Sequence, residues 1–186
     1  MRLYYTVSSE QDAIQTKPSL SLGGYKAVSP LPNGSFGNLF GDISMLTIKN
    51  GAQNQYIGLV LRNETAGAVT PNIYFTHPAG CYSLLKVAAV SMVADTDGQY
   101  YMEHIPNYNS QPLYATFYEA EGVANQRSLG AIPSGGMIGI WIERIFNVAD
   151  IKDDQNAIYK VATTDPYLYE EVELAKSDDI SITFSY

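Results

Sequence analysis

Cysteine is almost absent from this chain, which has one cysteine, Cys81, among its 186 residues. A disulfide within these residues is therefore excluded, and the chain is not a disulfide-built scaffold for an oxidising compartment. We expect Cys81 to be a buried, unreactive thiol. A domain of this length buries roughly 70% of the surface of its unfolded chain, so it can stay folded without disulfides or metals.

Charge is also scarce, because charged residues make up 16% of the chain, against about 25% in a typical soluble domain. The net charge is −8, and the few lysines and arginines form no cluster. Binding to phosphates or anionic lipids needs several convergent cations. The sequence therefore predicts neither direct nucleic-acid binding nor a basic membrane anchor.

Long apolar runs are absent as well. A membrane-spanning helix needs about 18 or more consecutive apolar residues, and no such run exists. The first residues, MRLYYTVSSE, lack the apolar core of a secretory signal. We expect folding in a cytoplasm.

Tyrosine, in contrast, is abundant, with 15 copies against one tryptophan and six phenylalanines. Tyrosine favours strands. It also favours interfaces, because its ring is apolar while its hydroxyl can remain hydrated or find a partner. Together with the low charge, this predicts a strand-rich domain whose surface contacts other protein.

Short segments of alternating side chains predict strands. The expected ranges are residues 2–7, 44–48, 56–62, 72–76, 82–93, 113–119, 137–146 and 179–186. The range 82–93 is compatible with a helix, but its valines favour a strand. Residues 56–62 and 72–76 predict a hairpin with a long loop. In residues 56–62, we expect Ile57, Leu59 and Leu61 to face the core.

Turn-forming residues separate these strands at 63–71, 95–98, 106–112 and 133–136. No long helical periodicity and no composition break interrupts this pattern. The sequence predicts one domain, residues 1–186, with an all-β fold. The expected architecture is an antiparallel β-sandwich of the jelly-roll or immunoglobulin-like kind.

Residues 8–42 contain many glycines and prolines and show little periodicity. The segment is too apolar for a solvated linker, and long irregular loops are usually functional or disordered. We expect an ordered, irregular arm that lies on the domain or on a neighbouring subunit. Deleting residues 8–42 is then expected to leave a soluble sandwich that no longer assembles. The aromatic residues Tyr25, Phe36 and Phe40 of this arm are candidate interface residues.

Arg144 stands in an otherwise apolar segment, three residues after Trp141. One interpretation is an arginine at the sheet edge with a packed stem and a solvated head. The other is an interface arginine, stacked near Trp141 or paired with an acidic neighbour. Trp141 and Arg144 complete the set of candidate interface residues.

No pattern predicts a metal or cofactor site. The spacing of His77, Cys81 and His104 matches no zinc motif. Asp95 and Asp97 resemble the start of a calcium loop, but tyrosines stand at the following ligand positions, so a hairpin turn is expected. We predict no metal and no cofactor.

Catalytic motifs are missing too, since no G-x-S-x-G elbow occurs. A serine–histidine–aspartate triad assembled in space stays open, with no local support. Two groups of acidic residues, Glu119 with Glu121 and Glu170 with Glu171 and Glu173, would suit a glycosidase. Solvated strand edges are the commoner use of such carboxylates. We predict no catalytic residue and no enzymatic activity.

Four segments resemble tailed-phage virion proteins. YIGLVLRNET followed by NIYFTHP, the stretch LGAIPSGGMIGIWIERIFN and the closing DDISITFSY are similar to segments of such proteins. MEHIPNYNSQPLYATFYEAEG looks like virion proteins of crAss-like phages that infect gut Bacteroidales. The resemblance covers about residues 36–186. It implies a β-sandwich virion component near the neck or tail, such as a ring or collar protein that builds on the portal.

The first functional hypothesis is therefore a structural virion protein, a subunit of a head–tail connector ring or of a tail, assembled in the host bacterial cytoplasm. Its partners would be copies of itself and neighbouring portal, ring or tail proteins. The alternative is a carbohydrate- or receptor-binding module of a tail or head fibre, in which exposed tyrosines and Trp141 stack on sugar rings while asparagine and aspartate supply hydrogen bonds. Aromatic residues spread over two opposed faces would favour ring packing, whereas a planar aromatic cluster in one open groove would favour glycan binding.

Overall fold

The two β-sheets of the chain are antiparallel at every strand pairing in the computed structural model. The structure describes residues 1–31, 40, 54–76, 83–120, 122–146 and 181–185. Within these residues no α-helix occurs, and two 3-10 turns, η1 (Pro18–Leu20) and η2 (Val123–Asn125), are the helical elements. The prediction of an all-β fold is confirmed.

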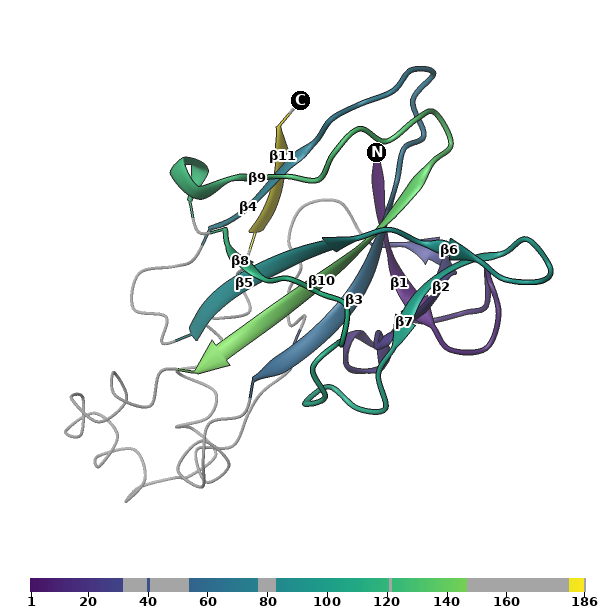
Figure 1. Cartoon of the computed structure of the whole chain (residues 1–186), viewed down its shortest axis with the longest axis horizontal. Coiled ribbons are helices and arrows are strands. Elements are labelled where there is room, and N and C mark those ends of the chain that lie inside the picture. Colours follow the sequence, from purple (N-terminus) through teal and green to yellow (C-terminus); the bar gives the residue numbers. More distant parts are fainter. Residues whose placement is uncertain (32–39, 41–53, 77–82, 121, 147–180, 186) are drawn as a thin grey trace.

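An eight-stranded sheet forms most of the fold (Figure 1). Its strands, in order across the sheet, are β6 (Val93–Ala94), β7 (Tyr100–His104), β2 (Gly23–Pro30), β1 (Arg2–Val7), β3 (Gln55–Arg62), β10 (Met137–Phe146), β5 (Ser83–Val90) and β8 (Tyr118–Glu119). The smaller sheet contains β11 (Ser181–Ser185), β4 (Asn72–Thr76) and β9 (Arg127–Ser128).

The central strands β3 and β10 are buried on both faces. Ile57, Leu59 and Leu61 share one face, as predicted, and belong to the core between the two sheets. The opposite face of β3 was not expected to be buried. Tyr56 and Val60 lie on that face, and both side chains are buried as well. A sheet with both faces covered carries apolar residues at nearly every strand position, so alternation alone does not show which face is solvated.

The first core fills the space between the large sheet and the small one. Ile73 and Phe75 of β4 pack with Leu59 of β3 and Ile140 of β10, and all four side chains are almost completely buried. This layer-on-layer packing is the common way for a sheet to bury one apolar face.

The second core lies inside the curl of the large sheet, around Trp141. Met102 and Ile105 of the β7 region belong to this cluster together with Ala88 of β5. β7 is four strands away from β10 in the sheet order, yet a Cβ added at Gly139 would lie 3.1 Å from the sulfur of Met102. The sheet therefore folds back over itself as a strongly curled half-barrel (Figure 1).

Two glycines allow the backbone to approach the Trp141 ring closely. Gly23 has φ +85°, and a Cβ there would lie 2.9 Å from the ring and 1.8 Å from the carbonyl oxygen of Glu103. A Cβ on Gly58 would lie 3.2 Å from the same ring and 2.8 Å from the Gly23 nitrogen. Only glycine fits at either position, because a side chain would collide with the backbone.

The prediction of an irregular arm over residues 8–42 is wrong for residues 23–30. They form β2, which lies between β1 and β7 within the large sheet. Deleting residues 8–42 would therefore remove an interior strand, so the expectation of a soluble truncated sandwich is withdrawn. Residues 32–39 and 41–53 of the segment, and the predicted strand at 44–48, lie outside the described residues.

The predicted hairpin of residues 56–62 and 72–76 is also wrong, because β3 and β4 belong to different sheets. The predicted strand at 113–119 is reduced to β8, two residues long. The strand predictions at 2–7, 72–76 and 137–146 are confirmed. The predicted turns at 95–98 and 133–136 are confirmed as well, with backbone hydrogen bonds that close each turn.

Within the described part of the chain, the structure contains no helix that is both long enough and apolar enough to cross a membrane.

Candidate functional site

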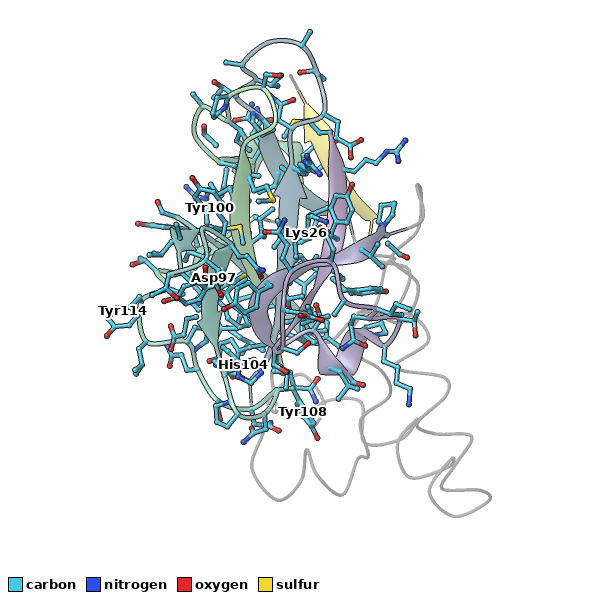
Figure 2. The ribbon with its side chains drawn as sticks, turned by 90° about the vertical axis from the view of Figure 1, so that its right-hand side faces the viewer. Lys26, Asp97, Tyr100, His104, Tyr108 and Tyr114 are labelled. Carbon is cyan, nitrogen blue, oxygen red and sulfur yellow. The ribbon has the colours of Figure 1, made fainter. Side chains whose placement is uncertain are left out.

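Leu113 and Tyr114 form an exposed apolar tip, and they are the candidate contact site of the chain. Their exposed fractions are 81% and 83%, the highest among the large hydrophobic side chains of the described residues. In Figure 2 the Tyr114 side chain projects from the ribbon at the outline of the molecule. The two adjacent exposed side chains make the tip a candidate contact surface.

The backbone of the apolar tip is held in place by Glu103 of β7. Both carboxylate oxygens of Glu103 lie 2.9 Å from the Leu113 nitrogen, and one lies 3.3 Å from the Tyr114 nitrogen. A charged acceptor makes such hydrogen bonds stronger than neutral ones. The tip is thus presented by a fixed backbone and not by a free loop.

The loop that precedes the tip is anchored to β3. The Tyr56 amide donates to the Tyr108 carbonyl at 2.7 Å, and the Asn109 side-chain amide donates to the Asn54 carbonyl at 3.3 Å. Within the loop, the Asn109 amide donates to the Asn107 side chain at 3.0 Å. Asparagine favours such turns because its side chain can bind the backbone two residues on.

A shallow groove of about 260 Å³ opens next to the tip. It lies where the edge strand of the large sheet, β8, meets the edge strand of the small sheet, β9. Tyr114, Tyr118 and Arg127 line it, with hydroxyls from Thr116 and Ser128. Val87 and Leu129, which belong to the core between the sheets, also line the groove.

Arg127 is fixed by two contacts at the groove. Its Nε donates to the Glu119 carbonyl at 2.8 Å, and its guanidinium carbon lies 5.4 Å from the centre of the Tyr118 ring. A cation over an aromatic face is attracted by the ring quadrupole. Arg127 therefore has a defined orientation although it is exposed.

A buried carboxylate, Glu143 of β10, lies inside the curl of the sheet. Its Oε1 accepts hydrogen bonds from the Asn54 amide at 2.7 Å and the Tyr56 hydroxyl at 2.9 Å. Burial raises the pKa of Tyr56 to about 12, and the hydrogen bond to Glu143 acts in the same direction. The tyrosine stays neutral, so it can donate to the carboxylate.

The raised pKa of Tyr56 predicts a loss of stability in alkali. The unfolded chain releases this proton near pH 10 and the folded chain near pH 12, so the free energy of unfolding falls as the pH rises between the two values. Tyr56→Phe should remove that part of the decline, measured as urea midpoints from pH 9 to pH 12. Tyr108→Phe, an exposed ring outside the network, is the control. An unchanged decline in Tyr56→Phe would contradict the assignment.

A second buried charge, Lys26 of β2, is neutralised inside the fold. Its ammonium group binds the Asp12 carboxylate, donates to the Ala27 carbonyl at 2.9 Å and lies 4.5 Å from the centre of the Tyr4 ring. The hydrogen bond from Lys26 lowers the pKa of Asp12. Asp12 has φ +64°, so its backbone is in the left-handed region. This pair attaches the N-terminal segment to β2 and has a structural role.

Three of the candidate interface residues are interior residues of the chain's own fold. Trp141 and Arg144 have no exposed surface, and Phe40 is buried. The Arg144 Nε donates to Gln55 at 3.0 Å, and its guanidinium carbon lies 4.8 Å from the centre of the Phe40 ring. The complete burial of Arg144 fits neither a solvated edge arginine nor an arginine exposed to a partner, whereas its pairing with an acidic neighbour stays a prediction.

Tyr25, another candidate interface residue, is half-buried on β2. Its hydroxyl donates to Asp95 at 2.9 Å, and its ring centre lies 5.6 Å from that of Tyr101. Phe36, the fifth candidate, lies outside the described residues.

Of the histidine, cysteine and glutamate residues considered for chemistry, the structure describes His104 and Glu119. His104 is exposed at the end of β7, and Glu119 is exposed on β8, whereas His77, Cys81, Glu121 and the acidic group at 170–173 lie outside the described residues. Among the residues that the structure describes, no three His, Cys, Asp or Glu side chains form a group able to hold a metal ion. The Asp95 carboxylate instead accepts the amides of Asp97 at 2.9 Å and Gln99 at 2.8 Å, as a hairpin turn requires.

Comparison with known proteins adds no relative: no family model, no curated protein and no solved structure matches the chain. The candidate site therefore depends on its geometry.

The sequence did not single out Glu103, Leu113 or Arg127. Leu113 was read as one apolar position of a strand, and nothing local shows that the Glu103 carboxylate takes the place of a strand partner. The one available signal was the turn residue pattern at 106–112, which places the following residues on a loop that carries function more often than a core strand does.

Proposed function

We propose that this chain is a non-enzymatic structural subunit of a virion, which binds copies of itself and neighbouring proteins in a head–tail connector ring or a tail. The observation that carries the proposal is the apolar tip, Leu113 and Tyr114, exposed on a backbone that Glu103 fixes. The resemblance of several segments to tailed-phage virion proteins supports the choice of assembly.

A fixed apolar tip suits an assembly contact for energetic reasons. Burying a leucine side chain is worth roughly 1.5–3 kcal/mol, and tyrosine is among the residues that dominate protein–protein interfaces. Because Glu103 already orders the backbone, little conformational freedom would be lost on binding. The tip would therefore act as an anchor that inserts into a partner surface.

A closed ring needs two different surfaces on each subunit, because each contact joins unlike patches. The second surface is the flank of β2, formed by the exposed side chains of Val28 on β2 and of Ile14 in the segment beside it. The Val28 amide donates to the Ala13 carbonyl at 3.0 Å, so the N-terminal segment lies along this strand. We infer that the apolar tip of one subunit binds the β2 flank of the next.

The double variant Leu113→Ser, Tyr114→Ser is expected to weaken self-association of the purified chain by at least about tenfold, because both anchor side chains are lost. Light scattering over a range of concentrations measures this, and circular dichroism checks the fold. Val93→Ser is the matched control, since Val93 is exposed on β6, outside the two proposed surfaces. Self-association that persists unchanged in the double variant would refute the role of the tip.

The carbohydrate-binding alternative has weaker support as the main function. The exposed tyrosines are spread over different elements: Tyr100 and Tyr101 lie on β7, Tyr108 lies in the following loop, and Tyr114 and Tyr118 lie at the groove. Figure 2 shows Tyr100, Tyr108 and Tyr114 at three separate places. A glycan platform would gather its rings in one plane, so the distribution favours protein contacts.

A further inference from the structure

The groove between β8 and β9 has a composition that suits one polar ring. Its volume of about 260 Å³ is slightly below the range of roughly 300–1,000 Å³ that is typical of ligand pockets, so it fits a ligand of a single ring. Val87 and Leu129 are its apolar lining, and Thr116 and Ser128 supply hydroxyl groups. Sites of this kind combine apolar surface with a few polar groups that fix the orientation of the ligand.

Among the residues that the structure describes, Arg127 is the only charged one that lines the groove. Its Nε is used by the Glu119 carbonyl, whereas no residue described in the structure forms an ion pair or hydrogen bond with its two terminal nitrogens. A guanidinium group held in this way presents two parallel donors, the geometry that binds a carboxylate with two hydrogen bonds.

The Glu119 carboxylate does not neutralise Arg127 inside the groove. On β8, Tyr118 is paired with Val87 and Glu119 with Lys86. Successive side chains of a strand point to opposite faces. Tyr118 lies on the groove side with Val87, so the Glu119 side chain points to the other face of the sheet. The groove is a locally positive place on a chain whose net charge is −8.

We propose that this groove binds a sugar that carries a carboxylate group. The sugar ring packs against the exposed ring of Tyr114, its hydroxyls bind Thr116 and Ser128, and its carboxylate binds the two terminal nitrogens of Arg127. Tyr118 and the Glu119 carbonyl are positioning groups, because they hold the guanidinium in place. This site shares Tyr114 with the apolar tip, whereas Leu113 does not line the groove.

Four compounds test the ligand class in nuclear magnetic resonance titrations of the full chain. Glucuronic acid and N-acetylneuraminic acid carry both a ring and a carboxylate, glucose carries the ring alone, and acetate carries the charge alone. At least one acidic sugar should bind about tenfold more tightly than glucose and acetate, as expected for a hydrogen-bonded charge pair. The tighter of the two identifies the source, a uronic or a sialic acid. Equal binding of acetate, or no binding of either acidic sugar, would overturn the proposal.

Variants of Arg127 and Tyr118 separate the effect of the guanidinium charge from the effect of the ring that positions it. Arg127→Gln should abolish the preference for the acidic sugar over glucose, and Tyr118→Ala should reduce it, whereas Tyr118→Phe keeps the ring under the guanidinium and should retain it. Tyr108→Ala is the matched control, because Tyr108 is exposed but does not line the groove. A preference that survives in Arg127→Gln would show that another group binds the carboxylate.

Single variants distinguish a failure of the sugar-binding proposal from a failure of the assembly proposal. Arg127→Gln should leave self-association unchanged, and Leu113→Ser should leave sugar binding unchanged. Loss of both properties in either variant would show that the two sites are not independent.

Discussion

Gly23→Ala is expected to destabilise the fold by about 3–5 kcal/mol, more than a positive φ alone would cost. The new Cβ would lie 1.8 Å from the Glu103 carbonyl oxygen and 2.9 Å from the Trp141 ring. Neither neighbour can move away without breaking the pairing of β2 with β7 or the core inside the curl. Urea unfolding followed by circular dichroism measures the change.

Gly98→Ala is the matched control for Gly23→Ala. Gly98 has φ +78° in the turn between β6 and β7, but nothing lies within 4 Å of a Cβ built there. Gly98→Ala therefore has the backbone strain of a positive φ without a steric collision. We expect it to lower the free energy of unfolding by about 1 kcal/mol. Equal losses in the two variants would mean that the close approach of β2 to Trp141 contributes nothing.

Trp141→Ala should cost about 3–5 kcal/mol, the usual loss for a large aromatic side chain removed from a core. The Trp141 ring is completely buried and fills the space between Gly23, Gly58 and the Met102 region. Its removal would leave the half-barrel without its central side chain, and the backbone around the two glycines cannot collapse easily into the cavity. The measurement is again the free energy of unfolding in urea.

Trp141→Phe keeps an aromatic ring at the centre of the curl and should recover at least half of the loss. Tyr118→Ala removes an exposed aromatic ring of the same sheet and should change stability by less than about 0.5 kcal/mol. A loss below about 1 kcal/mol for Trp141→Ala would show that the curl is held together by other contacts.

The strands with regular alternation were predictable from the sequence, because their side chains face two environments in turn. β1, β4 and β10 were placed at their observed bounds. β2 was missed because Gly23, Gly24 and Pro30 are typical of turns. In the fold, Gly23 and Gly24 have positive φ and accommodate an irregular pairing with β7, and Pro30 lies at the end of the strand. Gly23 is required by the close approach to a distant tryptophan and Gly24 by the approach to the Val7 carbonyl, neither of which a local pattern reveals.

The interior positions of Trp141 and Arg144 were not predictable for a related reason. Alternation indicates that two faces exist, but it does not tell whether the second face is covered by the same chain or by a partner. Here the curl of the sheet covers Trp141, and Gln55 and Phe40 accompany Arg144. An aromatic residue and an arginine within one strand give the same sequence pattern in both situations.

The contact tip was misread because tertiary hydrogen bonds replaced a strand. Residues 113–117 alternate as a strand would, yet the Leu113 and Tyr114 amides bind the Glu103 carboxylate instead of a neighbouring strand. A carboxylate ten residues away has no sequence signature. The exposure of Leu113 follows from this anchoring and from the short edge strand β8 that comes after it.

Native mass spectrometry of the purified full chain tests the proposed assembly most directly. We predict one dominant oligomer of fixed subunit number, because a contact between two unlike surfaces that closes by rotation gives a ring. The Leu113→Ser, Tyr114→Ser variant should appear as a monomer in the same solution. A wild-type chain that stays monomeric at every concentration, or one that gives an open series of masses, would contradict the account.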